Sequence, residues 1–291
     1  MRGGRIAAAL VVLLSGGAAG AQSITAGFPE FPVTLNIESS THPAAAFIRR
    51  AVGEGLTRRT SRPPPAPAFE LAVADGLQVD SSYRTWSFRI SPGASFESGE
   101  AVTASDVISS LERCRARGEL PELKSTLSRS ERTAYDSEAD WVDLVVEGAP
   151  EALREFPLRL AECPVFSQRA ASLFGRDFGA GANLIASGAY RVAGFKGGKF
   201  VTLERISGRG ERGGPAVLMV RSFRDSRHGL TALREGTLDL LFTQDIQVVE
   251  NAKKDETLRV VQCSLYEVVH RSTLSVPCAG GVIPGQLRYA S

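Results

Sequence analysis

The sequence has few of the residues from which catalytic and metal sites are built. Its three histidines, His42, His228 and His270, are scattered along 291 residues, and neither a G-x-S-x-G nor a C-x-x-C motif occurs. The first motif marks a common nucleophilic serine, and the second is a common zinc-binding spacing. We therefore predict no enzymatic activity, no cofactor and no metal site.

The sequence also lacks an excess of charge of either sign. The formal net charge is +2, and loss of an N-terminal leader that carries Arg2 and Arg5 would reduce it to zero. A neutral surface argues against nucleic acid or an anionic membrane as the main partner. The arginine pairs at 49–50 and 58–59 are interpreted as the solvated face of one amphipathic helix rather than as a phosphate site.

No apolar run is long enough to cross a bilayer. The N-terminal run Ile6–Leu14 has nine residues, whereas a spanning helix needs about 20. It follows a basic head and precedes the small residues Ala19 and Ala21, an order that predicts a signal peptide over residues 1–21, cleaved before Gln22. We therefore expect a periplasmic protein without a lipid anchor, since no cysteine follows the cleavage site. A retained membrane anchor is the alternative.

Only four cysteines are present: Cys114, Cys163, Cys263 and Cys278. An oxidising compartment favours disulfides, but four cysteines allow three pairings, and four buried free thiols are an alternative. We expect Cys114 to pair with Cys163, because the first ends a predicted helix and the second follows a strand predicted to pack under it. Cys263 and Cys278 are close in sequence, so their pairing needs little backbone travel.

The most specific pattern in the chain runs over residues 85–113. It predicts a strand with alternating apolar residues, two glycine-containing turns and a helix. Thr103 is expected to cap this helix, with Asp106 completing a capping box. Val107 and Leu111 belong to its predicted buried face.

Residues 85–113 resemble the signature of family 5 solute-binding proteins, the periplasmic peptide, oligopeptide and nickel receptors of ABC importers. The usual pattern is T-W-x-F-x-[IL]-R-x-G-V-x-F-x-[DN]-G-x-P-[VF]-T-A-x-D-V-x-x-S. The chain departs from it at Ala94, Glu97, Ser98 and Ala101. Three more segments resemble family elements: residues 54–56 (E-G-L), 186–192 (G-T-G-P-Y-x-[VL]) and 234–241 (A-L-x-x-G-E-[VI]-D).

The resemblance implies an α/β fold, namely a lobe of the type II periplasmic-binding-protein kind with a mixed sheet. It covers the expected mature chain, residues 22–291, but only the first half of a family member. Residues 283–291 resemble the start of the first helix of the second lobe. The second lobe is therefore expected to be absent.

The apolar periodicity predicts further elements. Strands are expected at 32–38, 140–146, 157–160 and 216–223, a β-hairpin at 186–205, and helices at 43–56, 150–156 and 226–234. Residues 208–213 fit G-x-G-x-x-G, but a strand is predicted after them, so a hairpin loop is favoured over a dinucleotide site. Asp136, Glu138 and Asp140 are interpreted as part of a solvated loop rather than as catalytic acids.

The resemblance also implies where a ligand cleft would lie. In the family, the loop after the first strand and a later loop line the cleft. In this chain these loops contain Thr41, His42, Phe47, Cys163, Pro164 and Phe166. Phe47 has a competing interpretation as a core residue, and His42 as a capping or surface residue.

Two functions from different classes follow from the resemblance. The chain is expected to be the solute-binding component of an ABC-type importer, with ABC permease subunits and a small solute, possibly a peptide, as partners. The alternative is a truncated or single-lobe periplasmic docking or scaffold protein without tight ligand binding. A split gene without an independent role is a third possibility. In each case the surface around residues 260–269 is expected to be covered by a second-lobe partner or by self-association.

Overall fold

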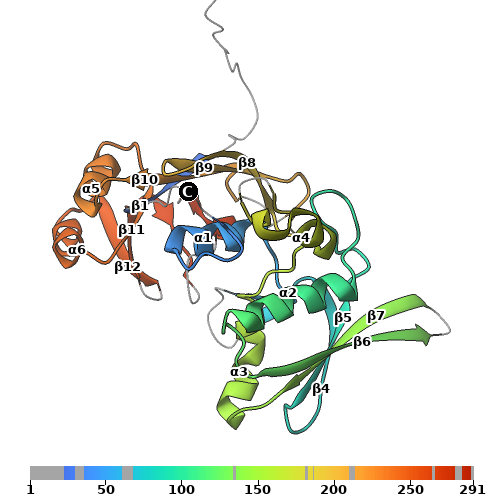
Figure 1. The fold of residues 1–291 in the computed structure, drawn as a ribbon. Helices are drawn as coiled ribbons and strands as arrows, with labels where there is room; N and C mark the ends of the chain where they lie inside the picture. The colour runs from blue at the N-terminus through green and yellow to red at the C-terminus, as the bar shows by residue number, and fades with distance from the viewer. Residues whose placement is uncertain are drawn as a thin grey trace, which may run out of the picture.

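The computed structural model describes residues 23–29, 36–60, 68–133, 136–180, 183–185, 187–209, 214–263, 266–278 and 284–289. The predicted signal peptide lies outside this part of the chain. Two large β-sheets, each with its own helices, make up most of the described structure (Figure 1), and two further sheets have two strands each. Within the described ranges, no helix combines the length and the apolar character needed to cross a membrane.

The larger sheet is mixed, as the sequence predicted. Its strands are β1 (Ser23–Pro29), β8 (Tyr190–Lys196), β9 (Phe200–Arg205), β10 (Val217–Phe223), β11 (Leu240–Thr243), β12 (Leu258–Cys263) and β13 (Tyr266–Arg271). They lie in the order β12-β13-β11-β1-β10-β9-β8. The central β1 is parallel to both of its neighbours, β10 and β11, and the remaining pairs are antiparallel.

Helices cover both faces of this sheet (Figure 1). The helices are α1 (Pro43–Val52), α5 (Ser226–Arg234) and α6 (Ile246–Lys253). Successive residues of a strand point to opposite faces. Leu240 of β11 accordingly packs in the core that contains α1, and Leu241 in the core that contains α5 and α6.

The smaller sheet has four strands and a separate core. Its strands are β4 (Ala74–Val79), β5 (Thr85–Ile90), β6 (Leu123–Thr133) and β7 (Asp136–Val146), in the order β4-β5-β7-β6, and its helices are α2 (Ala104–Ala116) and α3 (Pro150–Leu160). The lobe expected from the sequence is therefore built around two sheets rather than one. The remaining elements are β2 (Thr57–Arg59), β3 (Phe69–Leu71), β14 (Leu274–Ser275), β15 (Arg288–Tyr289), α4 (Gln168–Phe174), η1 (Gly175–Asp177) and η2 (Pro284–Gln286).

The signature segment folds as predicted. Residues 85–90 form β5, and every second residue is buried. Thr103 caps α2: the Asp106 N–H donates to the Thr103 hydroxyl at 3.4 Å, and the Thr103 N–H donates to the Asp106 carboxylate at 3.0 Å. The box fixes where α2 begins, so that Val107 and Leu111 face the core of the smaller sheet.

The first strand lies earlier than predicted. β1 spans Ser23–Pro29, whereas a strand was expected at 32–38. Residues 32–35 are outside the described part, and residues 37–39 form a turn. Because the middle of β1 is buried on both faces, it lacks the alternation that identifies a half-exposed strand.

The predicted strand at 157–160 is part of a helix. α3 continues to Leu160 with Pro157 in its interior. Proline lacks the N–H that an interior helical position donates, so its presence argued against a helix. Burial of Leu153, Phe156, Pro157 and Leu160 follows the helical period instead. The spacing of the apolar residues is here a better guide than the proline.

Three further segments differ from the prediction. Residues 136–140 belong to strand β7 and not to a loop. Arg58 and Arg59 lie on strand β2 and not on a helix. Residues 284–289 form the short η2 turn and strand β15, which pairs with β14, rather than the start of a helix.

The β8–β9 hairpin is anchored by a buried tyrosine that should make the fold sensitive to alkali. The Tyr190 hydroxyl donates to the Pro215 carbonyl at 2.8 Å, and burial raises the pKa of Tyr190 to about 12. The free energy of unfolding should therefore be unaffected by this group below pH 10, and fall by about 2 kcal/mol as the pH rises from 10 to 12. Urea unfolding of wild type and Tyr190→Phe at pH 7, 10 and 11.5 measures it. An equally steep loss in Tyr190→Phe would contradict this assignment.

Candidate functional site

The carboxyl ends of the parallel strands define one edge of the larger sheet. Since β1, β10 and β11 are parallel, their last residues, Pro29, Phe223 and Thr243, lie along the same edge. Residues 36–42, which connect towards α1, follow β1. Loops at such an edge are where open α/β sheets bind ligands. This edge is therefore the first candidate for a solute site.

Three phenylalanines close the core beneath this edge. The rings of Phe28 and Phe242 stack with centroids 4.3 Å apart. Phe47 of α1 meets both rings edge-on, at 6.0 Å and 5.5 Å. All three side chains are buried. Phe47 is therefore a core residue, which was the competing interpretation, and it supports the edge from below.

His42 and Thr41 lie at the surface of this edge. His42 is the N-cap of α1: its Nδ1 accepts a hydrogen bond from the Ala44 N–H at 3.1 Å. Its ring is half-buried, 6.4 Å from the ring of Phe28. Thr41 is exposed. Of the predicted cleft residues, these two present polar groups at the edge.

Arg49 fixes the backbone of residues 36–42. Its guanidinium donates to the carbonyls of Ile37, Glu38 and Ser40, at 3.0, 3.3 and 2.9 Å. Burial lowers the pKa of Arg49, and the carboxylate of Glu119 acts in the opposite direction. The arginine therefore holds this loop from inside the structure. The sequence pattern had instead indicated a place on a solvated helix face.

Glu38 ties the same residues to α2. Its carboxylate, 8% exposed, forms ion pairs with Arg113 and Arg117 near the end of that helix. Asn36 adds a bond from its amide to the Phe178 carbonyl at 2.6 Å. The ion pairs of Glu38 connect the edge of the larger sheet to the helix that packs on the smaller one. Glu38, Arg49, Arg113 and Arg117 were missed at the level of sequence, because charged residues are usually exposed.

The second group of predicted cleft residues lies at the other end of α1. Val165 donates to the Glu54 carbonyl at 2.9 Å, and Pro164 packs against Gly53, where a β-carbon would collide with it. The Phe166 N–H donates to the Ser110 hydroxyl at 2.9 Å, and its side chain is buried. α1 is about 15 Å long. The structure therefore does not bring Cys163, Pro164 and Phe166 together with Thr41 and His42.

Two hollows adjoin this second group. One of about 160 Å³ is lined by Arg49, Arg50, Gly53, Glu162 and Pro164 among others. Another, of about 330 Å³, lies between the two sheets and includes Glu54, Arg58 and Arg209. Burial raises the pKa of Glu54 above its ordinary value, and the adjacent Arg58 offsets only part of this rise. The Arg209 guanidinium is already bound to the Ser95 hydroxyl at 2.7 Å, so this space is a polar junction more than an open ligand pocket.

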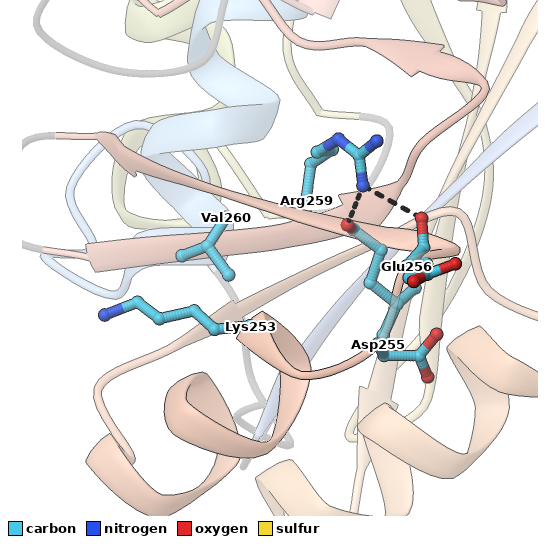
Figure 2. A pocket seen from close by; sticks show the side chains of 6 residues that line it. Lys253, Asp255, Glu256, Arg259 and Val260 are labelled. Carbon is cyan, nitrogen blue, oxygen red and sulfur yellow. Dashed lines mark hydrogen bonds between the residues drawn. The ribbon is translucent and has the colours of Figure 1, made fainter.

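A third hollow, of about 580 Å³, lies where α6 leads into β12 (Figure 2). Arg259 folds back to donate to the carbonyls of Glu256 and Leu258, at 2.9 and 2.7 Å. Asp255 binds Arg234, and Lys253 binds Glu250, each at 2.9 Å. The charged groups that line this hollow are bound to residues in and around the turn between α6 and β12. The hollow lies at β12, an edge strand of the larger sheet. We assign no solute to it.

The described residues contain one group of three potential metal ligands: Cys114, Glu119 and Cys163. The two sulfurs are joined in a disulfide, and Arg117 donates to the Cys114 sulfur at 3.1 Å. Disulfide sulfurs next to a guanidinium are poor ligands for a cation, because metal binding needs thiolates. The group is structural.

Loss of the Arg49 brace should loosen residues 36–42. In Arg49→Gln we expect the amides of residues 37–40 to exchange at least tenfold faster with deuterium, because three charge-assisted hydrogen bonds are lost. Arg50→Gln is the matched control, since Arg50 pairs with Glu162 at the opposite side. Unchanged exchange in Arg49→Gln, or equal changes in the two variants, would contradict the brace.

The comparisons with known proteins agree with this geometry. The sequence model of the bacterial extracellular solute-binding proteins, family 5 Middle, matches residues 68–274. Solved structures with the same fold include the following three. AgaA of A. tumefaciens R10, in complex with agropinic acid, is 18% identical with a TM-score of 0.66, over 84% of this chain and 48% of AgaA. MoaA of the same strain, in complex with mannopinic acid, is 19% identical with a TM-score of 0.64, over 83% of this chain and 49% of MoaA.

DppA of Helicobacter pylori, in complex with the peptide STSA, is 16% identical with a TM-score of 0.63, over 83% of this chain and 50% of DppA. The chain thus spans about half the length of the structures it matches. No curated protein sequence matches it. At these identities the likeness establishes the fold, a type II periplasmic-binding-protein lobe.

Proposed function

Since the chain belongs to the bacterial extracellular solute-binding proteins of family 5, we propose that it is the solute-binding component of an ABC-type importer, acting in the periplasm on a peptide or a similar small solute. The observation that carries this proposal is the family match over residues 68–274. Proteins of this family bind solutes rather than transform them. ABC permease subunits are the proposed partners.

Within this proposal, the solute lies at the edge formed by β1, β10 and β11. The braced residues 36–42 supply a rigid wall, with Thr41 and His42 as the polar groups. Rigid walls support affinity because little conformational entropy is lost on binding. Cys163, Pro164 and Phe166 then act indirectly, by holding the smaller sheet against α1. The proposed solute is a peptide or a similar small molecule: the similar DppA was solved with a peptide, and AgaA and MoaA with agropinic and mannopinic acid.

A single lobe covers only one side of a solute. The chain spans about half of each matched structure, and Phe47, Cys163 and Phe166 are buried. We therefore propose that a second lobe completes the site, for which another protein or self-association is one candidate source. These same observations favour the alternative function, a single-lobe docking or scaffold protein without tight ligand binding.

Native mass spectrometry of the protein purified from its own periplasm tests the proposal. We expect a chain that begins at Gln22, carrying either a small solute or a second protein. A solute in the complex supports the receptor, whereas a protein partner without solute supports the docking function. Recovery of the protein in the membrane fraction with Met1 retained would contradict both.

A further inference from the structure

The tip of the β8–β9 hairpin combines two aromatic and two cationic side chains. It reads Phe195-Lys196-Gly197-Gly198-Lys199-Phe200, and Gly198 adopts a φ of 67°, which the tight turn requires. Phe195 is 38% exposed, and Lys196 and Lys199 are exposed. β8 is the last strand of the seven-stranded sheet (Figure 1), and the register of β8, β9 and β10 places the tip at the same edge as the carboxyl ends of β1 and β10.

Cross-strand pairing continues the cationic and aromatic side chains of the tip across the neighbouring strands. Lys196 pairs with Phe200 across the hairpin, and Phe200 pairs with Arg221 of β10. Residues directly opposite each other share a face of a sheet. Lys196, Phe200 and Arg221 therefore form a cation–aromatic–cation row on one face. The Arg221 guanidinium lies over the ring of Phe223, 5.7 Å from its centroid, which extends the row.

The cations of the tip and of this row have no acidic counterpart within the described part of the chain. Lys196, Lys199 and Arg221 form no ion pair there. The nearest acids along these strands are already engaged: Glu204 pairs with Arg191 at 3.2 Å, and Asp225 bonds the ring of His228 at 2.8 Å. The tip is thus a local site of positive charge on a chain of nearly neutral total charge.

We propose that the β8–β9 tip is a contact for an anionic membrane surface, with the headgroups facing Lys196, Lys199 and Arg221 and the exposed Phe195 ring at the acyl boundary. Two features favour a lipid surface over an acidic protein. Lysines are flexible point charges suited to a diffuse anionic surface, whereas carboxylates of a protein are better matched by arginine forks. A narrow hairpin tip also offers far less than the roughly 800 Å² per partner of a stable protein interface.

The contact is local and weak, which agrees with the low net charge. Near-neutrality excludes strong attraction of the whole surface to a membrane. A cation near an anionic surface still contributes about fivefold in partitioning, and apolar rings add to this. A receptor held transiently at the membrane would meet its permease by a search in two dimensions.

Vesicle sedimentation tests the proposal with protein purified from the periplasm. The vesicles are phosphatidylcholine alone, and phosphatidylcholine with 30% phosphatidylglycerol. We expect the wild type to bind only the second kind, and Lys196→Gln/Lys199→Gln to bind it about 25-fold more weakly. Lys253→Gln/Lys254→Gln, at the end of α6, removes the same charge elsewhere and should bind like the wild type. Circular dichroism establishes that each variant is folded.

Three results would overturn the proposal. The first is binding of the wild type that does not depend on phosphatidylglycerol. The second is an equal loss of binding in the two double variants, which would indicate a general charge effect. The third is failure to bind vesicles together with capture of a polyglutamate peptide that requires Lys196 and Lys199, which would assign the tip to an acidic protein.

Discussion

Replacing Cys114 and Cys163 together by alanine is expected to lower the free energy of unfolding by about 4 kcal/mol. The two cysteines are paired in the structure, with a Cα–Cα distance of 6.0 Å and a sequence separation of 49. A cross-link over a loop of this length removes that much chain entropy from the unfolded state in the loop-closure model. The pair also ties the end of α2 to the segment after α3, inside the core of the smaller sheet.

The second pair provides the control. Cys263 and Cys278 are also at disulfide distance, with a sequence separation of only 15, so Cys263→Ala/Cys278→Ala should cost about 3 kcal/mol. Urea unfolding under oxidising conditions compares the two double variants. A loss below about 1 kcal/mol for Cys114→Ala/Cys163→Ala, or the reverse order of the two losses, would show that the first pair does not hold the lobe together.

Asp239→Ala is expected to destabilise the protein by about 3 kcal/mol. The carboxylate is 7% exposed and accepts hydrogen bonds from the Thr25 N–H at 2.8 Å and the Tyr289 hydroxyl at 2.9 Å. Arg271 lies 3.6 Å away. Removing the carboxylate leaves these donors and a cation partly buried without their acceptor, which costs more than the bonds themselves.

Two milder variants separate the contributions at Asp239. Asp239→Asn keeps an oxygen for one donor and should lose about half as much stability, while Tyr289→Phe removes one neutral partner and should lose about 1 kcal/mol. Thermal or urea unfolding of the three variants at pH 7 gives the comparison. Equal losses in Asp239→Ala and Tyr289→Phe would mean that Thr25 and Arg271 find other acceptors. The account of β1 as a strand anchored by this carboxylate would then be wrong.

The signature segment could be predicted in detail because its signals are local. Alternation in β5 and the capping box at Thr103 each depend on residues close in sequence. The helix α5, Ser226–Arg234, was predicted with the bounds it has in the structure for the same reason. The pairings Cys114–Cys163 and Cys263–Cys278 also agree with the sequence prediction, although the strand expected before Cys163 is part of helix α3.

Strands defined by distant partners could not be predicted. β1 pairs with β10 and β11, about 200 residues away in sequence. Its burial on both faces removes the period of two. β6, Leu123–Thr133, was missed for the opposite reason, because its polar sequence reads as a loop and its strand state comes from pairing with β7.

The candidate site was only partly predictable. Thr41 and His42 lie near the edge of the sheet, in the loop that the resemblance indicated, and their contact with a solute stays a prediction. This loop is held by ion pairs of Glu38 with Arg113 and Arg117. The partners lie about 75 residues apart in sequence, so no local pattern predicts the cluster. The separate core of the smaller sheet was not predicted. The spacing of apolar residues indicates that a residue is buried, but not which core it joins.

The most direct test of the account is isothermal calorimetry of the chain, alone and monomeric, against a library of short peptides. A drug-sized solute normally has about 70–90% of its surface buried, and one open lobe covers roughly half of it. A loss of about 4 kcal/mol from this exposure moves a micromolar binder to about millimolar. We therefore predict no peptide that binds more tightly than micromolar, with affinity restored only when a second lobe is added. Submicromolar binding by the monomeric chain would contradict the claim that it is one half of a two-lobed receptor.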